Sequence, residues 1–307
     1  MKAVKNILLC SLAFFVLQST YAQQTPQFSQ YMYNTISINP AYAGSKEVLV
    51  VNLLNRNQWM GVDGAPVTQT LSAHSGIPGS NVGVGLSVIN DKLGFERTTY
   101  VYSDVSYKLN LDHYDEYKLT FGVKAGFRKY SIDEELLNDP NYANDPFLMG
   151  ADFKWDPNVG VGVYFRGESF YLGVSAPRLL TYRGSSEYFS LERITYYVNG
   201  GYVMDVNPHL IFKPAFIVKY TNGAPVSFDF SAMFLINQNL WLGGSYRFKD
   251  SFGALVNFKI AKGVNVGYAY DYVTSGLNTA TFGSHELMLN FEFLWPRPRC
   301  KCKDLYN

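Results

Sequence analysis

The chain has 307 residues and a formal net charge of +1, with 17% charged residues, 16% aromatic residues and 26 glycines. Globular proteins average about 25% charged residues, so this chain is poor in charge and rich in aromatic side chains. The nearly neutral charge excludes the basic footprint of a nucleic-acid-binding protein, and three cysteines are too few for a disulfide-rich fold.

Residues 1–22 have the features of an export signal. Lys2 and Lys5 form a short basic region, an apolar run follows at 7–17, and Ala22 is a small residue suited to cleavage. The apolar run is too short to remain in a bilayer as a membrane-spanning helix. Cleavage after Ala22 would leave 24 of the 26 basic residues beside 25 acidic ones, so the exported chain would stay close to neutral.

The cysteines do not define a structural site. Cys10 would leave with the signal, and Leu9 stands before it where a lipoprotein signal needs a small residue. Cys300 and Cys302 are too close in sequence to hold the fold together, and they supply only two ligands to a metal ion. We therefore expect residues 296–307 to form a periplasmic tail without a metal, although the two thiols could pair with each other or with a partner.

Residues 23–46 are expected to form a separate segment, and within it residues 27–44 have no regular hydrophobic period, so they fit neither a strand nor an amphipathic helix. The segment is dense in Tyr, Asn and Gln, and Asn39-Pro40 is typical of a turn. These residues indicate a periplasmic segment or a plug inside a lumen. The candidate residues for binding a partner or filling the lumen are Gln27, Phe28, Tyr31, Tyr33, Asn34, Asn39, Pro40 and Tyr42.

Residues 47–295 contain segments of alternating hydrophobicity, each about as long as a tilted membrane strand. In residues 81–89, Val and Leu share one face while Asn, Gly and Ser share the other. The pattern predicts an all-β fold, an antiparallel transmembrane β-barrel of about 14 strands. A soluble all-β protein with polar outer faces is the alternative. It does not explain the many Phe, Tyr and Val on the strand faces opposite the polar residues. The expected strands are 47–57, 66–76, 81–90, 95–111, 117–130, 157–166, 168–177, 190–203, 208–219, 225–235, 239–248, 251–261, 263–274 and 285–295.

The connections alternate in length. Those after even-numbered strands are short, for example 77–80 and 204–207, whereas several after odd-numbered strands are long. Outer-membrane barrels keep short turns in the periplasm and long loops outside, so both termini are expected in the periplasm unless one folds into the lumen. The long connections are 58–65, 131–156, 178–189 and 275–284.

Charged residues on the strands fall on the face opposite the apolar side chains. Charges of both signs suit a wet or plugged interior and would be costly against lipid. The residues expected to face inward are Lys118, Lys124, Arg128, Lys213, Asp229, Arg247, Lys259, Asp271, Glu286 and Glu292.

The connection 131–156 carries seven Asp and Glu residues. It lacks the ligand spacing of a calcium-binding EF-hand loop, so a solvated surface loop is the default interpretation. Long loops without secondary structure are often functional, and this one is also a candidate partner surface or lumen cap.

No motif for catalysis is present. The sequence lacks a nucleophile elbow, a phosphate-binding loop and a dinucleotide fingerprint. His285-Glu286 lies on an expected strand and has no second His at the spacing of a zinc site. We therefore expect no enzymatic activity, no catalytic residues, no cofactor and no metal.

The segment after the first expected strand is dense in special residues. Gly61, Gly64 and Pro66 suit a compact hairpin connection. Trp59 could stack on Arg56 or lie at the membrane interface. The candidate structural-motif residues are Arg56, Gln58, Trp59, Gly61, Gly64 and Pro66.

Five motifs together carry a resemblance to a known family. They are residues 27–44, Arg-x-Gln-Trp-x-Gly-x-x-Gly-Ala-Pro-x-Thr at 56–68, Asp-x-x-Gly at 91–94, Gly-Tyr-Ala-Tyr-Asp-Tyr at 267–272 and Gly-Ser-His-Glu at 283–286. In this order the chain resembles the PorP/SprF family of type IX secretion proteins over nearly its whole exported length.

The resemblance implies an outer-membrane component of the secretion and gliding machinery of Bacteroidetes, embedded in outer-membrane lipid. Its implied partners are periplasmic secretion-machinery proteins and an exported surface protein such as an adhesin. The family has no catalytic residues to carry over. We expect a docking function, and the alternative is a channel or transporter for small or hydrophobic molecules.

Overall fold

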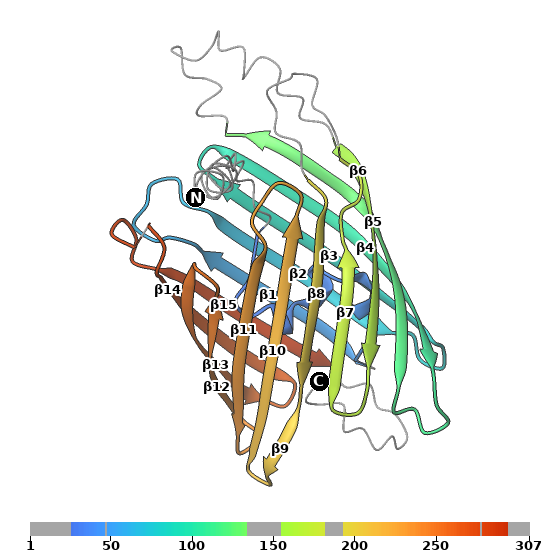
Figure 1. Cartoon of the computed structure of the whole chain (residues 1–307). Coiled ribbons are helices and arrows are strands. Elements are labelled where there is room, and N and C mark those ends of the chain that lie inside the picture. The colour runs from blue at the N-terminus through green and yellow to red at the C-terminus, as the bar shows by residue number, and fades with distance from the viewer. Residues whose placement is uncertain (1–25, 47, 134–154, 182–192, 277, 294–307) are drawn as a thin grey trace, which may run out of the picture.

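The computed structural model describes residues 26–46, 48–133, 155–181, 193–276 and 278–293 (Figure 1). Fifteen strand segments follow one another around an antiparallel barrel, and the pairing of β15 with β1 closes it. The segments β8 and β9 both pair with β10 and are two parts of one strand, so the barrel has 14 strands. The predicted fold class is confirmed. The export signal at 1–22 and the tail at 296–307 lie outside the described residues.

The strand bounds agree with the predicted spans to within a few residues at most ends. The first eight segments are β1 (Leu49–Asn57), β2 (Val67–Gly76), β3 (Val82–Leu93), β4 (Glu96–Asn110), β5 (Lys118–Ile132), β6 (Trp155–Arg166), β7 (Phe170–Ala176) and β8 (Thr195–Tyr202). The others are β9 (Met204–Asn207), β10 (Leu210–Thr221), β11 (Ser227–Ile236), β12 (Leu240–Arg247), β13 (Ser251–Ala261), β14 (Val264–Val273) and β15 (Ser284–Phe293). Of the acidic connection 131–156, residues 134–154 lie outside the described part.

One connection was predicted wrongly. Residues 204–207, expected to be a turn, form β9 and pair with β10, with a register shift between Leu210 and Ile211. All four residues of β9 are exposed. Asp205 and Asn207 are of residue types common in turns, but Met204 and Val206 alternate with them and continue the apolar outer face, 48% and 52% exposed.

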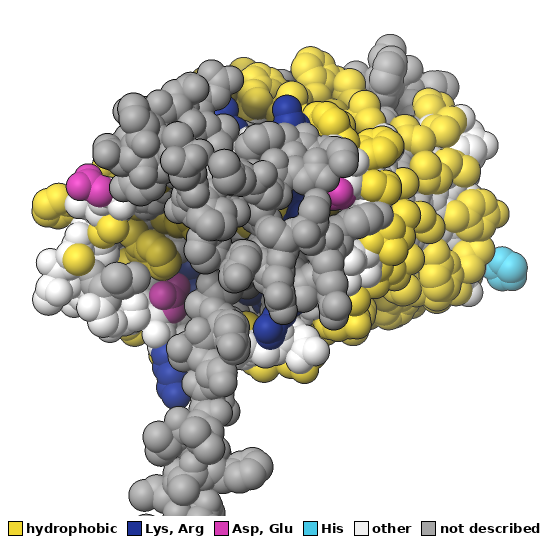
Figure 2. All heavy atoms as spheres, turned by 90° about the horizontal axis from the view of Figure 1, so that it is seen from above, with side chains coloured by type: hydrophobic (Ala, Val, Ile, Leu, Met, Phe, Trp, Pro, Cys, Tyr) yellow, Lys and Arg dark blue, Asp and Glu magenta, His cyan; other side chains and the backbone are white. Residues whose placement is uncertain are grey.

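The outer surface of the barrel is apolar. On β3, Val84, Leu86 and Val88 point outward and are 40%, 61% and 39% exposed, whereas the inward-facing Ser87 is 1% exposed. The space-filling view shows hydrophobic side chains covering much of the visible outer wall (Figure 2). Such a surface fits lipid, and the protein is a multi-pass barrel of the outer membrane. Among the described residues, no helix combines the length and the apolar character needed to cross a bilayer.

The two mouths of the barrel differ. Short turns, such as those joining β2 to β3 and β11 to β12, lie at the bottom in Figure 1, and the connections from β1 to β2 and from β14 to β15 lie at the opposite end. We call these ends the short-turn mouth and the long-loop mouth. The ten charged residues predicted to face inward all lie on the inward-facing side of their strands, and Lys124 and Glu286 are fully buried.

Residues 26–46 run through the barrel and are here called the luminal strap. The strap contains three single turns of 3₁₀ helix, η1 (Tyr31–Tyr33), η2 (Thr35–Ser37) and η3 (Pro40–Tyr42). Short 3₁₀ turns with two breaks between them explain why the sequence showed no regular period.

The strap begins at one mouth and ends at the other. Pro26 lies beside Pro177 and Arg178, which follow β7 at the long-loop mouth. Lys46 pairs with Glu292 at the end of β15, at the short-turn mouth. The sequence placed both ends of the chain at the short-turn mouth unless one folded into the lumen. The strap does fold into the lumen, and it carries Pro26 to the opposite mouth.

Candidate functional site

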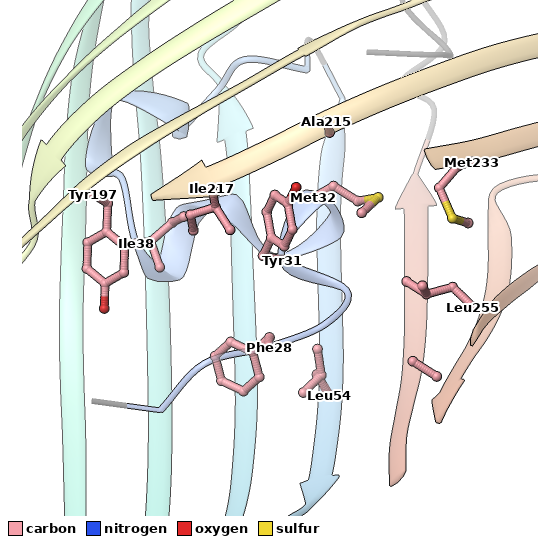
Figure 3. Close-up of a cluster of buried hydrophobic side chains, with 11 residues drawn as sticks. Phe28, Tyr31, Met32, Ile38, Leu54, Tyr197, Ala215, Ile217, Met233 and Leu255 are labelled. Carbon is pink, nitrogen blue, oxygen red and sulfur yellow. The ribbon is translucent and has the colours of Figure 1, made fainter. Parts of the chain in front are cut away.

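The apolar side chains of the strap pack against the inner wall. Phe28, Tyr31, Met32 and Ile38 form one buried cluster with residues from several strands. Figure 3 shows the strap side chains between wall residues contributed by opposite sides of the barrel. The wall members of this cluster are Leu54, Tyr197, Ala215, Ile217, Met233, Leu255 and Ala269. The strap therefore forms the centre of the largest apolar cluster inside the barrel, among the described residues.

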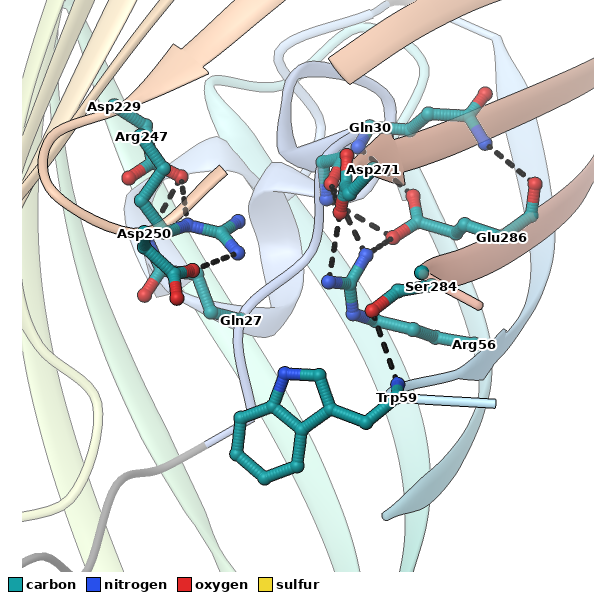
Figure 4. Close-up of polar contacts among 12 residues, drawn as sticks. Gln27, Gln30, Arg56, Trp59, Asp229, Arg247, Asp250, Asp271, Ser284 and Glu286 are labelled. Carbon is teal, nitrogen blue, oxygen red and sulfur yellow. Dashed lines mark hydrogen bonds and ion pairs between the residues drawn. The ribbon is translucent and has the colours of Figure 1, made fainter. Parts of the chain in front are cut away.

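A charged network fixes the first part of the strap. Arg56 Nη2 lies 2.8 Å from Asp271 Oδ2, and Arg56 Nη1 lies 3.1 Å from Glu286 Oε2. The backbone amides of Ser29 and Gln30 donate to the two oxygens of Glu286 at 2.9 and 2.8 Å. The hydroxyl of Ser29 donates to Asp271 at 2.6 Å (Figure 4). Hydrogen bonds to ionised groups are stronger than neutral ones, so this network is a firm anchor for the strap.

Strand register brings the network together. Arg56 on β1 stands opposite Glu286 on β15, and Glu286 stands opposite Ala269 on β14, two residues before Asp271. The three charged residues come from three separate sequence motifs, and Ser29 and Gln30 belong to a fourth. Alternation correctly placed Asp271 and Glu286 on the inner face, but Arg56 was not among the residues predicted to face inward, and only the observed register shows that the three meet.

A second ion pair lies under the middle of the strap. Lys124 on β5 stands directly opposite Asp104 on β4, with Nζ 2.9 Å from Oδ1 and both side chains fully buried. Lys124 also donates to the backbone oxygen of Ile36 at 3.2 Å. Asp104 was not among the residues predicted to face inward.

Two asparagines of the strap bind different parts of the wall, Asn34 on β2 and Asn39 on β6. Asn34 donates to Thr70 at 3.0 Å and accepts from Ser72 at 2.9 Å. Asn39 donates to the backbone oxygen of Val163 at 3.1 Å, while its side-chain oxygen accepts the amide of Ala41. An amide side chain can donate and accept at once, which explains the use of Asn where an irregular segment crosses between two walls.

Inward-facing glycines make room for the strap. A Cβ atom on Gly122 would overlap the backbone of Pro40 and Ala41, and one on Gly83 would overlap Ala43. Similar overlaps with the strap occur at Gly85, Gly162, Gly173 and Gly267. Glycine at these six inward positions is thereby explained, because the strap can approach a strand this closely only where the side chain is absent.

The strap leaves the barrel through polar contacts at the short-turn mouth. Ser106 donates to the backbone oxygen of Ala43 at 2.6 Å, and Arg166 donates to that of Ser45 at 3.1 Å. Lys46 Nζ lies 2.6 Å from Glu292 Oε1. Burial opposes the charged form of Lys46, but the neighbouring carboxylate of Glu292 outweighs it and raises the pKa of Lys46, which favours a charged Lys46 in this contact.

At the long-loop mouth the strap is held by Gln27. Its side-chain nitrogen donates to Asp229 at 2.8 Å and to Ser227 at 3.2 Å. Asp229 also accepts from Arg247 Nε at 2.9 Å, and Figure 4 shows this group beside the Arg56 network. The strap is therefore anchored at its start, in its middle and at its end.

All eight candidate residues of residues 23–46 lie inside the barrel. Phe28 and Tyr31 are buried, and Tyr33 packs against their cluster. Pro40 opens η3, and the ring of Tyr42 meets those of His74 and Tyr164 edge to face. The sequence analysis did not include Ser29 or Gln30, since small polar residues without periodicity give no signal of an anchor.

The candidate structural motif organises the long-loop mouth. The amide of Gln58 donates to the oxygen of Pro66 at 2.9 Å and closes the hairpin connection from β1 to β2. Gly61 has φ +95° and packs under the ring of Phe282. Gly64 has φ +72°, and its oxygen accepts the amide of Gly94 at 2.8 Å. The motif thus joins three connections at this mouth.

Trp59 and Arg56 do not form the stacked pair that the sequence suggested as one alternative. Arg56 occupies an inward position of β1 and points to Asp271 and Glu286. Trp59 follows the strand and donates its amide to Ser284 at 3.1 Å (Figure 4). Carboxylates buried beside the guanidinium bind it more strongly than an aromatic face would.

Among the residues that the structure describes, no group of three or more His, Cys, Asp or Glu side chains is arranged to hold a metal ion. Cys300 and Cys302 lie outside them.

Comparison with known proteins gives one match at the level of families. The family model described as type IX secretion system membrane protein PorP/SprF matches residues 20–291. No curated protein matches the chain.

Several solved structures are similar to the chain at low sequence identity. The outer membrane protein Omp33 of Acinetobacter baumannii is 12% identical, with a TM-score of 0.46, over 81% of this chain and 100% of that one. The toluene transporter TodX of P. putida is 8% identical, with a TM-score of 0.48, over 85% and 94%. The monoaromatic hydrocarbon channel CymD is 10% identical, with a TM-score of 0.49, over 86% and 93%.

Proposed function

We propose a docking function for this chain, which belongs to the PorP/SprF family of type IX secretion system membrane proteins. In this proposal the barrel is a non-enzymatic outer-membrane platform that assists the export of surface proteins, such as adhesins, or holds them at the cell surface. Its partners are periplasmic proteins of the secretion machinery on one side and the exported protein on the other.

The observation that carries this proposal is the luminal strap. Its residues contact strands on all sides of the barrel, and both its apolar and polar side chains are buried. A lumen filled in this way is poorly suited to free passage of solutes, so the mouths and loops are the surfaces left for function. Short turns face the periplasm in barrels of this kind, which assigns the long loops to the exported protein.

The test compares the wild-type chain with a variant lacking residues 23–45. We expect the shortened barrel to reach the outer membrane but to lose display of the exported protein. Gly122→Val is the second variant, because it keeps the whole chain while its side chain would overlap the strap backbone. Amounts of folded barrel are compared by heat-modifiable migration on gels, and display is measured by surface labelling. Normal display by both variants would contradict the docking function.

The rival function is a channel or transporter for small or hydrophobic molecules. Conductance across planar bilayers distinguishes the two, because the wild-type protein with its strap in place should give no steady current. Mass spectrometry of proteins that co-purify from detergent-solubilised membranes should then identify large partners. Steady conductance without such partners would favour the channel.

A further inference from the structure

A cavity of about 280 Å³ lies between the strap and the wall at the short-turn mouth. Strap residues Met32, Tyr33 and Tyr42 form one side, and strands β10 to β15 together with β1 form the other. Ligand-binding pockets begin at about this size. The docking function proposed above gives no role to this cavity.

The cavity has an excess of positive charge. Lys46, Lys213, Lys259 and Lys262 line it, and Glu292 is the acidic residue among its lining side chains. Glu292 is already paired with Lys46 at 2.6 Å. An anionic ligand is therefore favoured over a neutral or cationic one, since lysine carries a compact positive charge with three donors.

A buried amide points to the same kind of ligand. Asn257 on β13 lines the cavity and is 2% exposed. Within the described part of the chain, its Nδ2 group donates no hydrogen bond. A buried donor without a partner costs free energy, and a ligand with an acceptor oxygen would remove that cost.

One part of the wall is apolar and aromatic, beside polar residues such as His74, Asn265 and Asn290. Trp241, Leu235 and Val50 line the cavity opposite the strap side chains Met32 and Tyr33. Inorganic phosphate would leave these surfaces without contacts. A ligand that carries a carboxylate on an apolar body would use both the lysines and the apolar wall.

We propose that this cavity binds a carboxylate attached to an apolar group, with the carboxylate held by the lysines and Asn257. The apolar part lies between Trp241 and the strap. Such a group could be a small molecule or the carboxyl end of a polypeptide, and the chemistry of recognition is the same. Because the ligand touches both the strap and the wall, it stabilises the strap in its observed position.

The experiment is calorimetric titration of the full-length protein in a zwitterionic detergent. The probes are N-acetyl-L-phenylalanine and N-acetyl-L-phenylalaninamide, which differ only in the carboxylate. We expect the acid to bind and the amide to bind at least about tenfold more weakly, as the loss of charged hydrogen bonds implies. A short peptide ending in phenylalanine, with a free or an amidated end, separates the two sources of carboxylate.

Variants locate the site. Lys259→Met and Asn257→Leu should each weaken binding of the acid by about tenfold, and Trp241→Phe should remove a fluorescence change that accompanies binding. Lys118→Met, at the same mouth but in a separate cavity, is the matched control and should bind as the wild type does. Equal binding of acid and amide, no binding of the acid at millimolar concentration, or wild-type affinity in both cavity variants would each overturn the proposal.

Discussion

The guanidinium of Arg56 lies 2.8 Å from the carboxylate of Asp271, Nη2 to Oδ2, and both side chains are at most 3% exposed. The two residues lie on β1 and β14, which are separated by β15. Their contact therefore spans β15, the last strand of the barrel, which pairs with the first strand, β1. Because Ser29 bonds to Asp271 and Arg56, the same contact holds the strap.

Replacement of Arg56 by Met should destabilise the folded barrel strongly. It would leave Asp271 and Glu286 buried without their shared cation, and removal of one partner from a buried ion pair typically costs about 3–5 kcal/mol. Denaturant titration of the purified protein in detergent measures the free energy of unfolding. We expect the loss to fall in that range.

The matched control is Lys92→Met. Lys92 pairs with Asp133 at 3.0 Å, but their side chains are 41% and 35% exposed, and exposed pairs contribute about 0–1 kcal/mol. Arg56→Met and Lys92→Met should therefore differ clearly. Equal effects would mean that the Arg56 network contributes no more than an ordinary surface pair.

Lys124 and Asp104 should show strong coupling. The single substitutions Lys124→Met and Asp104→Leu each leave one buried charge without its partner, whereas the double variant leaves none. Replacing both members of a buried pair is often far less harmful than replacing one. In a double-mutant cycle on the unfolding free energy, we expect the double variant to be more stable than either single variant. Additive losses would contradict a direct pair.

The barrel could be predicted from the sequence because each strand alternates between lipid and lumen. In β3, for example, valines and a leucine alternate with Gly83, Gly85 and Ser87, and this pattern directly reflects the two solvents on either side of the wall. The strand β9 was not recognised in this way, because its alternation of Met204 and Val206 with Asp205 and Asn207 spans only four residues and those polar residue types are common in turns.

The strap was recognised as unusual, but its path was not predictable. Its contacts depend on register and on the shape of the inner wall, so no local pattern marks Ser29 as a partner of Asp271. The glycines on the inner faces were visible in the sequence, and they were the available sign that a backbone passes close to the wall. Alternation alone did not show whether these positions are glycine because a backbone passes close to them or for another reason.

Gly122→Val should displace the strap. The new side chain would overlap the backbone of Pro40 and Ala41, and η3 cannot then occupy its position against β5. We expect the barrel to remain assembled while the strap becomes accessible, because the strand pairing itself does not need glycine. Limited proteolysis measures this, with cleavage inside residues 26–46 appearing in the variant and absent from the wild type.

Gly244→Val is the control for the added side chain. Gly244 is also in a strand, but a Cβ atom there would come no closer than 3.4 Å to another atom, the backbone oxygen of Gly253. It should leave the strap as protected as in the wild type. Strap cleavage in both variants, or in neither, would show that the inner glycine does not hold the strap in place.

The first described residue of the strap should be reachable from the side opposite the short turns. Pro26 lies at the long-loop mouth, whereas Ser80 lies in the exposed turn between β2 and β3 at the short-turn mouth. In a background with Cys300→Ser and Cys302→Ser, Pro26→Cys should react with a membrane-impermeant maleimide on intact cells. Ser80→Cys should react only after the outer membrane is opened, because short turns face the periplasm. The reverse pattern would place the long loops in the periplasm, and protection of both cysteines on intact cells would contradict the exit of the strap at the cell surface.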